Sequence, residues 1–489
     1  MQFAFSEFAP DAGELAPGVL MQAQGVQPQQ IGYGPAPSLQ TPASATALPG
    51  ACRGMVSLTQ RDGTNVVFAF TATAAYELSA TYALDGTPIG TGFNCTSGDD
   101  WSLTGFGNKL MATNTTDGLQ AYDIESPAGF TAIADAGAPR DIFRCANTLV
   151  GLDCLDANSN RDNRLVRSSA IGDQTEWKKK GADKQPLEDG GALIGGIDLK
   201  NNAALLFQAD AIRVMQFGSG PAGTFSLLKA FDKRGSVGRR SLIGIDGVAY
   251  WLSTDGFKMF SQANGLAHIG AGKIDKWFFD RVDQADLAKV QVGLDPLNKL
   301  VVWRYPSLQI TSETVFDDCL GYSWQFNKWF YWQEQTTYLS QIATPGYTLD
   351  GMNDFGPLDS IDIPLDDRFW QGGQPVFAAL DENLKYATFS GANYAAVLES
   401  GFSNSPVSGL IGWATPIDNA STGTLQLGVK DSLDNSATWK TGAAKVSAGR
   451  VPLRGRGMNI AFRRNIDAGD TWSYANGVNH VVAATGGRK

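Results

Sequence analysis

Histidine is almost absent from this chain of 489 residues, which contains two, His268 and His480. A Ser-His-Asp or Cys-His catalytic set would have to use one of them, and neither accompanies a GxSxG nucleophile elbow. The sequence also lacks a GxxxxGK[ST] phosphate loop and a GxGxxG fingerprint after a strand. We therefore expect both histidines to be structural and the protein not to be an enzyme. We assign no catalytic, cofactor-binding or metal-ligating residue.

Cysteine is scarce as well, and no two cysteines form a CxxC pair. The five residues lie far apart, at Cys52, Cys95, Cys145, Cys154 and Cys319. An odd number cannot all pair within one chain, and with so few histidines no Cys/His zinc pattern exists. We expect buried free thiols.

Charged residues make up 18% of the chain, and no window holds about 18 consecutive apolar residues. A membrane span is therefore not expected. The first residues, MQFAFSEFAPDAGEL, lack a basic region followed by an apolar stretch, so we expect no secretory signal. The protein would then stay in the cytoplasm of the cell that makes it or leave by lysis.

Acidic residues outnumber basic ones, but unevenly. Residues 440–489 carry nine Lys or Arg against Asp467 and Asp470, a local charge of +7, so the net −10 leaves −17 on residues 1–439. This balance argues against a dedicated nucleic-acid binder, because DNA affinity depends on neutralising phosphates. Five arginines near the C-terminus are predicted to point in alternating directions, which favours an acidic protein neighbour over DNA. They are Arg450, Arg454, Arg456, Arg463 and Arg464.

Glycine (56 residues) and proline (21 residues) are plentiful, which indicates many turns and few long helices. Residues 1–50 contain seven prolines and should form neither a helix nor a central strand. We expect an extended N-terminal arm whose aromatic residues are buried on its own body or on a neighbour. Deleting Met1–Leu39 should then impair assembly more than folding of the body.

After the arm, one phrase recurs: a short apolar run, a polar or glycine turn, and a second run with an aromatic residue. It occupies 65–78, 107–124, 147–169, 202–217, 247–260, 298–309 and 381–400. Hairpins at such a period predict an all-β fold, with a β-propeller-like body of six or seven blades over 51–405. Two stacked β-sandwiches are the alternative. Residues 345–367 should be an insertion loop, and 406–489 a small antiparallel β-domain.

One segment, 273–292, has a helical spacing of apolar residues, and Asp275 or Asp283 could cap its pieces.

Several motifs suggest chemistry and are better explained by structure. Residues 156–167 begin like a calcium loop but have Arg161 where glycine must turn and Arg167 where a glutamate is required, so a polar hairpin turn is expected. The segment Ser432-Leu-Asp434-Asn-Ser436-Ala-Thr438-Trp439 resembles the Asp-box hairpin of propellers. The densest acidic cluster comprises Asp359, Asp362, Asp366 and Asp367, which we interpret as solvated charges.

An aromatic run could form a sugar platform, but its alternation favours a blade core with Asn327 and Lys328 at the turn. It comprises Tyr322, Trp324, Phe326, Trp329, Phe330, Tyr331 and Trp332.

Four stretches together resemble the tail nozzle proteins, or packaged-DNA stabilisation proteins, of short-tailed bacteriophages. The first is APDAGELAPGVLMQAQGVQPQQIGYGPAPSL, and the second is SSAIGDQTEW followed by EDGGALIGGIDLKNNAALLFQADAIRVMQF. The third runs from SLIGIDGVAYWLSTDGFKMF to IGAGKIDKWFFDRV, and the last is AGDTWSYANGVNHVVAATGGRK. The family's pattern lacks a counterpart of the 345–367 loop.

The resemblance implies a structural virion protein of the tail, made in the host cytoplasm. Subunits would form a homohexameric ring below the portal and its adaptor protein, contact tail fibre or plug proteins, and let genomic DNA pass without sequence-specific binding. The alternatives are a secreted glycosidase or sialidase-like propeller, or a carbohydrate-binding propeller.

Overall fold

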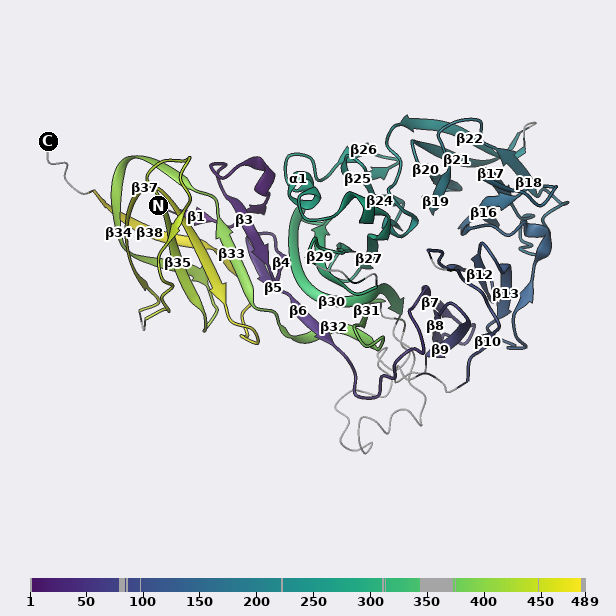
Figure 1. The fold of residues 1–489 in the computed structure, drawn as a ribbon, viewed down its shortest axis with the longest axis horizontal. Coiled ribbons are helices and arrows are strands. Elements are labelled where there is room, and N and C mark those ends of the chain that lie inside the picture. Colours follow the sequence, from purple (N-terminus) through teal and green to yellow (C-terminus); the bar gives the residue numbers. More distant parts are fainter. Residues whose placement is uncertain are drawn as a thin grey trace.

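The computed structural model describes residues 2–78, 84, 87–96, 98–220, 223–309, 312, 314–343, 373, 375–446 and 448–484. Its strands form a ring of antiparallel sheets with a second β-domain beside it (Figure 1). The predicted all-β fold with a propeller-like body is confirmed. The expected insertion loop 345–367, with its four aspartates, lies outside the described residues.

Five four-stranded sheets follow one another along the chain and form blades 1 to 5. Blade 1 consists of β7 (Gly54–Thr59), β8 (Asn65–Phe70), β9 (Ala74–Leu78) and β10 (Gly90–Thr91). Blade 2 consists of β11 (Ser102–Phe106), β12 (Lys109–Asn114), β13 (Gly118–Asp123) and β14 (Thr131–Ala132), followed by η2 (Ala134–Ala136). Blade 3 consists of β15 (Asp141–Cys145), β16 (Thr148–Leu155), β17 (Arg161–Ser168) and β18 (Asp183–Pro186).

Blade 4 consists of β19 (Leu193–Asp198), β20 (Ala203–Gln208), β21 (Ala211–Gly220) and β22 (Gly223–Asp232). The short η3 (Arg239–Ser241) leads into blade 5, which consists of β23 (Leu242–Ile245), β24 (Val248–Ser253), β25 (Gly256–Ser261) and β26 (Gly265–His268). The recurring phrases of these five blades fall on the two middle strands of each blade. The first strand of each pair (β8, β12, β16, β20 and β24) is buried along nearly its whole length, on both faces, and is therefore the most apolar.

Blades 6 and 7 share one long, curved strand, β30 (Lys328–Ala343) (Figure 1). Blade 6 consists of β27 (Gln291–Asp295), β28 (Leu300–Tyr305), β29 (Phe316–Ser323) and the first half of β30. At Thr336 the partner changes, and the second half of β30 pairs with β31 (Pro375–Asp381), which pairs with β32 (Tyr386–Asn393). The fourth strand of blade 7 is β6 (Pro37–Gln40), from the N-terminal arm. The described residues therefore form seven blades, and the arm completes the last one.

The last two recurring phrases do not each mark one hairpin. Residues 298–309 contain β28 alone, and residues 381–400 contain β32 of blade 7 and β33 (Ala396–Ser400) of the next domain. Apolar alternation identifies a strand but not the sheet that it joins.

The C-terminal domain is built round two long strands. It contains β33, β34 (Ser403–Asp418), β35 (Thr424–Lys430), β36 (Thr438–Trp439), β37 (Val451–Ile466) and β38 (Ala475–Ala484). Strand β37 pairs with β33, β34 and β35, and β38 pairs with β34. The expected boundary between residues 405 and 406 is wrong, because it falls inside β34.

The N-terminal arm lies between the two domains (Figure 1). Its strands are β1 (Gln2–Ala4), β2 (Glu7–Phe8), β3 (Val19–Gln24), β4 (Val26–Pro28), β5 (Tyr33–Pro35) and β6, with η1 at Pro10–Ala12. Strand β3 pairs with β33 on one side and with β2 and β30 on the other, so the expectation that the arm has no central strand is wrong. The prolines permit this because β3 contains none of them.

The predicted helix is shorter than expected. Only Asp275–Phe279 (α1) is α-helical, and Gln284–Lys289 (η4) is a 3₁₀ helix. Asp283 caps η4 through the backbone N–H of Ala285, as predicted. Asp275 does not cap α1; its carboxylate instead accepts the backbone N–H of Phe257 at 3.0 Å.

Candidate functional site: the channel mouth

Seven strands form the inner ring of the propeller: β7, β11, β15, β19, β23, β27 and the second half of β30. Glycines let neighbouring blades approach closely. A Cβ at Gly105 of β11 would lie 2.6 Å from a methyl carbon of Leu58 on β7, and one at Gly293 of β27 would lie 2.7 Å from the Phe377 ring. Charged residues gather where inner strands begin. They are Arg53, Asp99, Asp100, Arg140, Asp141, Arg239 and Arg240.

Arg239 and Arg240, which we call the arginine bridge, extend from blade 5 to blades on the other side of the ring. Arg239 donates to the carbonyls of Arg140 at 2.9 Å and Trp101 at 3.2 Å. Arg240 pairs with Asp100, and its guanidinium lies 5.3 Å from the centre of the Tyr338 ring. Blade 5 is thereby linked to blades 2, 3 and 7. The arginine bridge spans the propeller's own channel at this mouth.

The carboxylates of the mouth are held by several donors each. Asp141 is buried, accepts the hydroxyl of Ser102 at 2.6 Å and the backbone N–H of Gly196 at 3.1 Å, and lies 3.6 Å from Arg239. Burial raises the pKa of Asp141, and Arg239 opposes this rise. Asp99 is different: burial also raises its pKa, but the hydrogen bonds from Thr115 and from the Asp100 backbone, together with the charge of Arg239, outweigh that effect and the net pKa is lowered.

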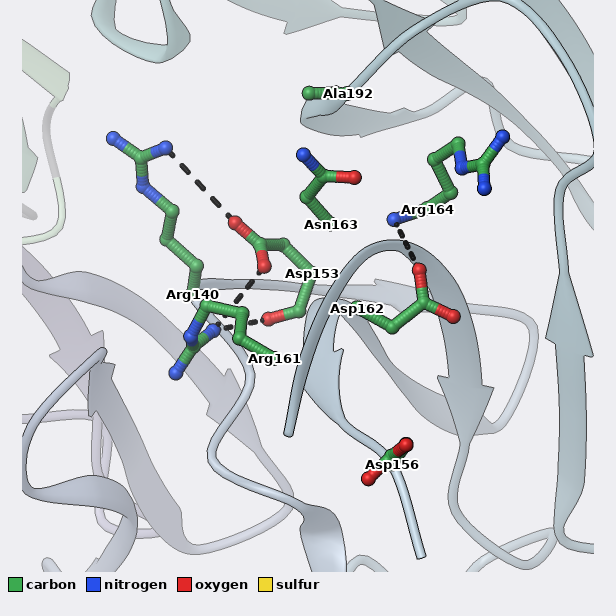
Figure 2. A pocket seen from close by; sticks show the side chains of 8 residues that line it. All are labelled: Arg140, Asp153, Asp156, Arg161, Asp162, Asn163, Arg164 and Ala192. Carbon is green, nitrogen blue, oxygen red and sulfur yellow. Dashed lines mark hydrogen bonds and ion pairs between the residues drawn. The ribbon is translucent and has the colours of Figure 1, made fainter. Parts of the chain in front are cut away.

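Beside the mouth, an open hollow of about 620 Å³ lies over blade 3 and the start of blade 4 (Figure 2). The guanidinium of Arg161 donates to the backbone carbonyl of Asp153 at 2.6 Å and lies 3.3 Å from the Asp153 carboxylate (Figure 2). The guanidinium of Arg140 lies 4.0 Å from the same carboxylate. The hollow is lined by Arg140, Asp153, Asp156, Arg161, Asp162, Asn163, Arg164 and Ala192. The three arginines and three aspartates are equal in number. These charges mainly join neighbouring loops and do not create a field of one sign.

Arg304 is a buried cation close to the mouth. Its guanidinium donates to the carbonyl of Thr336, at the bend of β30, and lies 4.3 Å from the centre of the Phe316 ring. Burial, followed by the nearby Arg240, lowers the pKa of Arg304 to about 9. Arg304 has no ion pair with a carboxylate in the described part of the chain.

Sequence reasoning missed the channel mouth because its residues form no contiguous motif. The available signal was weak: charged pairs such as Asp99-Asp100, Arg140-Asp141 and Arg239-Arg240 recur just before or at the start of inner strands. The mouth appears once the chain closes into a ring.

The two histidines lie far from the mouth. His268 ends β26 and contacts Arg234, whereas His480 is buried between the rings of Phe3 and Phe462. All five cysteines are buried and free, as expected.

The other predicted motifs also have structural explanations. Residues 156–160 form the turn between β16 and β17, and the Asp156 carboxylate accepts two backbone N–H groups of that turn at 2.8 Å each, which confirms the polar hairpin turn. In the aromatic run, Tyr322, Trp329, Phe330 and Trp332 belong to the main core, which confirms the blade-core interpretation.

The segment resembling an Asp-box does not reproduce that hairpin. Asp434 is exposed, and among the described residues no turn amide donates to its carboxylate. Trp439 is half-buried, and the guanidinium of Arg463 lies 4.1 Å from the centre of its ring.

In the described part of the chain, no group of three or more His, Cys, Asp or Glu is placed to hold a metal ion, and no helix is long and apolar enough to cross a membrane.

No protein-family model and no curated protein matches this sequence. Solved structures similar to it include streptogramin B lyase (12% identity, 72% of this chain and 96% of the other, TM-score 0.41). The β-propeller domain of Cps50 (Swd1) from Myceliophteria thermophila has 9% identity, 71% and 99% coverage, and a TM-score of 0.41. The WD40 repeats of RRP9 have 10% identity, 64% and 90% coverage, and a TM-score of 0.37. The arrangement of its own sheets makes this chain a seven-bladed β-propeller with an additional β-domain.

Proposed function

We propose that this chain is a structural virion protein, the tail nozzle subunit of a short-tailed bacteriophage. Copies would form a ring that continues the DNA channel below the portal and adaptor, retains the packaged genome and then conducts it. The observation that supports the proposal is the position of the segments that resemble the tail nozzle family, which we call the family-like segments. Three of them, hundreds of residues apart in sequence, meet at one seam between the propeller and the C-terminal domain.

The first contact of the seam joins the arm to helix α1. The Asp11 carboxylate accepts the backbone N–H groups of Lys276 at 2.7 Å and Trp277 at 3.0 Å. Because the first N–H groups of a helix have no partner within it, Asp11 satisfies them from a distant part of the chain. The APDAGEL and GAGKIDKWFF segments are thereby fixed together.

The second contact is the buried side chain of Tyr33, in the GYGP segment. Its hydroxyl accepts the backbone N–H of Phe8 at 2.8 Å and donates to the carbonyl of Trp329 at 3.0 Å. Tyr33 also pairs with Ala475 of β38, in the C-terminal family-like segment. One tyrosine thus links the arm, blade 6 and the C-terminal domain.

The seam is continuous with the main hydrophobic core, which contains Phe8 of the arm, Trp303 of blade 6 and Phe462 of the C-terminal domain. A core shared in this way makes the two domains one rigid unit. Such a unit suits a ring subunit, whose two ends must hold a fixed angle for the ring to close. Since the arginine bridge spans the propeller's own channel, DNA would pass between subunits.

The experiment is to examine particles released from cells that produce this chain. Mass spectrometry should detect the chain in purified particles, and antibodies against residues 396–480 should label the far end of a short tail in negative-stain images. Particles assembled without the chain should lose their DNA. Absence of the chain from particles, or normal infection without it, would contradict the proposal.

A further inference from the structure

The outer face of β37 carries a row of four exposed residues, Pro452, Arg454, Arg456 and Met458, which we call the β37 row. They alternate with the buried residues Val451, Leu453, Gly455 and Gly457, because successive side chains of a strand point to opposite faces. Met458 is 38% exposed although it is a large apolar residue. The exposed face of this strand therefore combines positive charge with apolar surface.

The neighbouring strand extends the same surface. Trp413 of β34 pairs with Pro452 across the sheet, and the guanidinium of Arg450 lies 4.4 Å from the centre of the Trp413 ring. Tryptophan, methionine and arginine are enriched at protein–protein interfaces, whereas aspartate and glutamate are depleted. The β37 row with Arg450 and Trp413 contains three of the enriched residue types and neither of the depleted ones.

Three other basic groups of this end form ion pairs inside the domain. Arg464 is 1% exposed and pairs with Asp418 at 2.9 Å, and Lys445 pairs with the same carboxylate. Arg463 pairs with Glu399 at 2.6 Å. Arg450 and Arg454, in contrast, form no ion pair with a carboxylate of the described residues. Positive charge therefore remains available on the outer face.

We propose that the β37 row, with Arg450 and Trp413, docks against an acidic surface of a second copy of this chain. The argument is charge complementarity within one sequence: the chain carries −10 overall, whereas its outer face at β37 presents Arg450 and Arg454 without an ion pair to a carboxylate of the described residues. A ring needs a head-to-tail contact, in which two different surfaces of the same chain meet. The proposal rests on the ring of the proposed function and identifies one half of its interface.

A zero-length cross-link tests the contact directly. R454K keeps the charge and adds an amine that a carbodiimide joins to an adjacent carboxylate. With an equal mixture of ¹⁴N- and ¹⁵N-labelled protein, we expect mixed-isotope peptides that connect position 454 to Asp or Glu of another copy. The matched control is R164K, an exposed propeller arginine beside Asp162, which should give links within one chain. Links from position 454 that stay within one chain, or no links, would overturn the proposal.

Charge reversal provides an independent measurement on the full-length chain. R454E combined with R456E should weaken self-association in sedimentation equilibrium about tenfold or more, since like charges then face each other. The thermal unfolding midpoint should stay unchanged, because both side chains are exposed. Unchanged self-association would refute the interface. If the cross-links form but the chain is absent from phage particles, the interface stands and the nozzle proposal fails.

Discussion

At the scale of single residues, the ring depends on contacts that cross it. Most packing in a propeller joins each blade to the next, but the arginine bridge joins blade 5 to blades 2 and 7. Such contacts resist opening of the ring at any blade boundary. Their contribution to the free energy of unfolding depends on burial, since an ion pair in water contributes little.

Removing one partner of the bridge should therefore cost stability. Arg240 and Asp100 have side chains 22% and 23% exposed, so R240A should lower the free energy of unfolding by about 1–3 kcal/mol. Urea denaturation of R240A, D100A and the double variant should give a coupling energy of about 1 kcal/mol. The control is K200A. The side chains of Lys200 and its partner Asp246 are 61% and 80% exposed, so this substitution should lower the free energy of unfolding by less than about 0.5 kcal/mol. Equal effects of R240A and K200A would show that the bridge contributes no more than a surface pair.

Asp275 gives a prediction for pH dependence. Burial raises the pKa of this carboxyl to about 6; the hydrogen bond from Phe257 and the charge of Lys258 oppose the rise, and Asp11 and Asp255 add to it. Because the folded-state pKa lies above the unfolded value of about 3.9, the folded protein binds more protons between these values. The contribution of Asp275 to stability is thus fully present below about pH 3.9 and is lost as pH rises from there through 6.

The variant D275N should remove that dependence and keep an acceptor for the backbone N–H of Phe257. The variant minus wild-type difference in unfolding free energy should be near zero at about pH 3, below both pKa values. It should reach about 1 kcal/mol in favour of the variant at pH 7, after allowance for the partial exposure of Asp275. A flat difference for D275N would mean that Asp275 ionises normally in the folded protein.

At the scale of elements, the sequence predicts strands better than it predicts their partners. The middle strands of blades 1 to 5 were recognisable because one strand of each pair is apolar and its partner follows at short range. Strand β6 was not, because Leu39 pairs with Phe389 across most of the chain length. The partner change at Thr336, where β30 leaves blade 6 for blade 7, also has no local signal.

The arm shows the same limit and changes one expectation. From the sequence, deletion of Met1–Leu39 should impair assembly more than folding. In the structure this segment buries Phe5, Phe8, Leu20 and Tyr33 in the main core and contributes part of β6 to blade 7. Loss of four large side chains from a core costs about 6–12 kcal/mol, close to the whole stability of a domain. We now expect the deletion to cause unfolding or aggregation of the isolated chain.

A milder variant tests the contact by which the arm caps helix α1 without removing the side chains that the arm buries in the core. D11A removes the acceptor for the N–H groups of Lys276 and Trp277, and should cost about 1 kcal/mol while the arm stays folded. Circular dichroism and limited proteolysis of the two variants should show cleavage in the deletion protein and an intact D11A protein. If the deletion protein proved as resistant to protease as wild type, the arm would be dispensable for folding.

At the scale of the whole molecule, the separation of charge decides how the protein meets DNA. Residues 1–439 carry most of the negative charge, so a channel that they line would repel phosphates and let DNA slide. The basic C-terminal end was the possible exception. Arg464 is not available for DNA binding, because it is buried against Asp418. Arg463 is already paired with Glu399.

Three of the five arginines considered, Arg450, Arg454 and Arg456, remain outside these two pairs, and this number limits what the arginines can add to DNA binding. Each phosphate contact contributes about −0.9 to the slope of log affinity against log salt, so these three arginines together should add no more than about −3 to that slope. Binding of a fluorescent duplex, followed by anisotropy, should be weak at low salt and largely lost at physiological salt, where screening acts within about 8 Å. R454A combined with R456A should flatten the slope, whereas R463A should change folding stability more than DNA binding. Tight binding that resists salt and disappears in R454A combined with R456A would show that this face binds the genomic DNA. The β37 row would then be a DNA contact and not a contact between subunits.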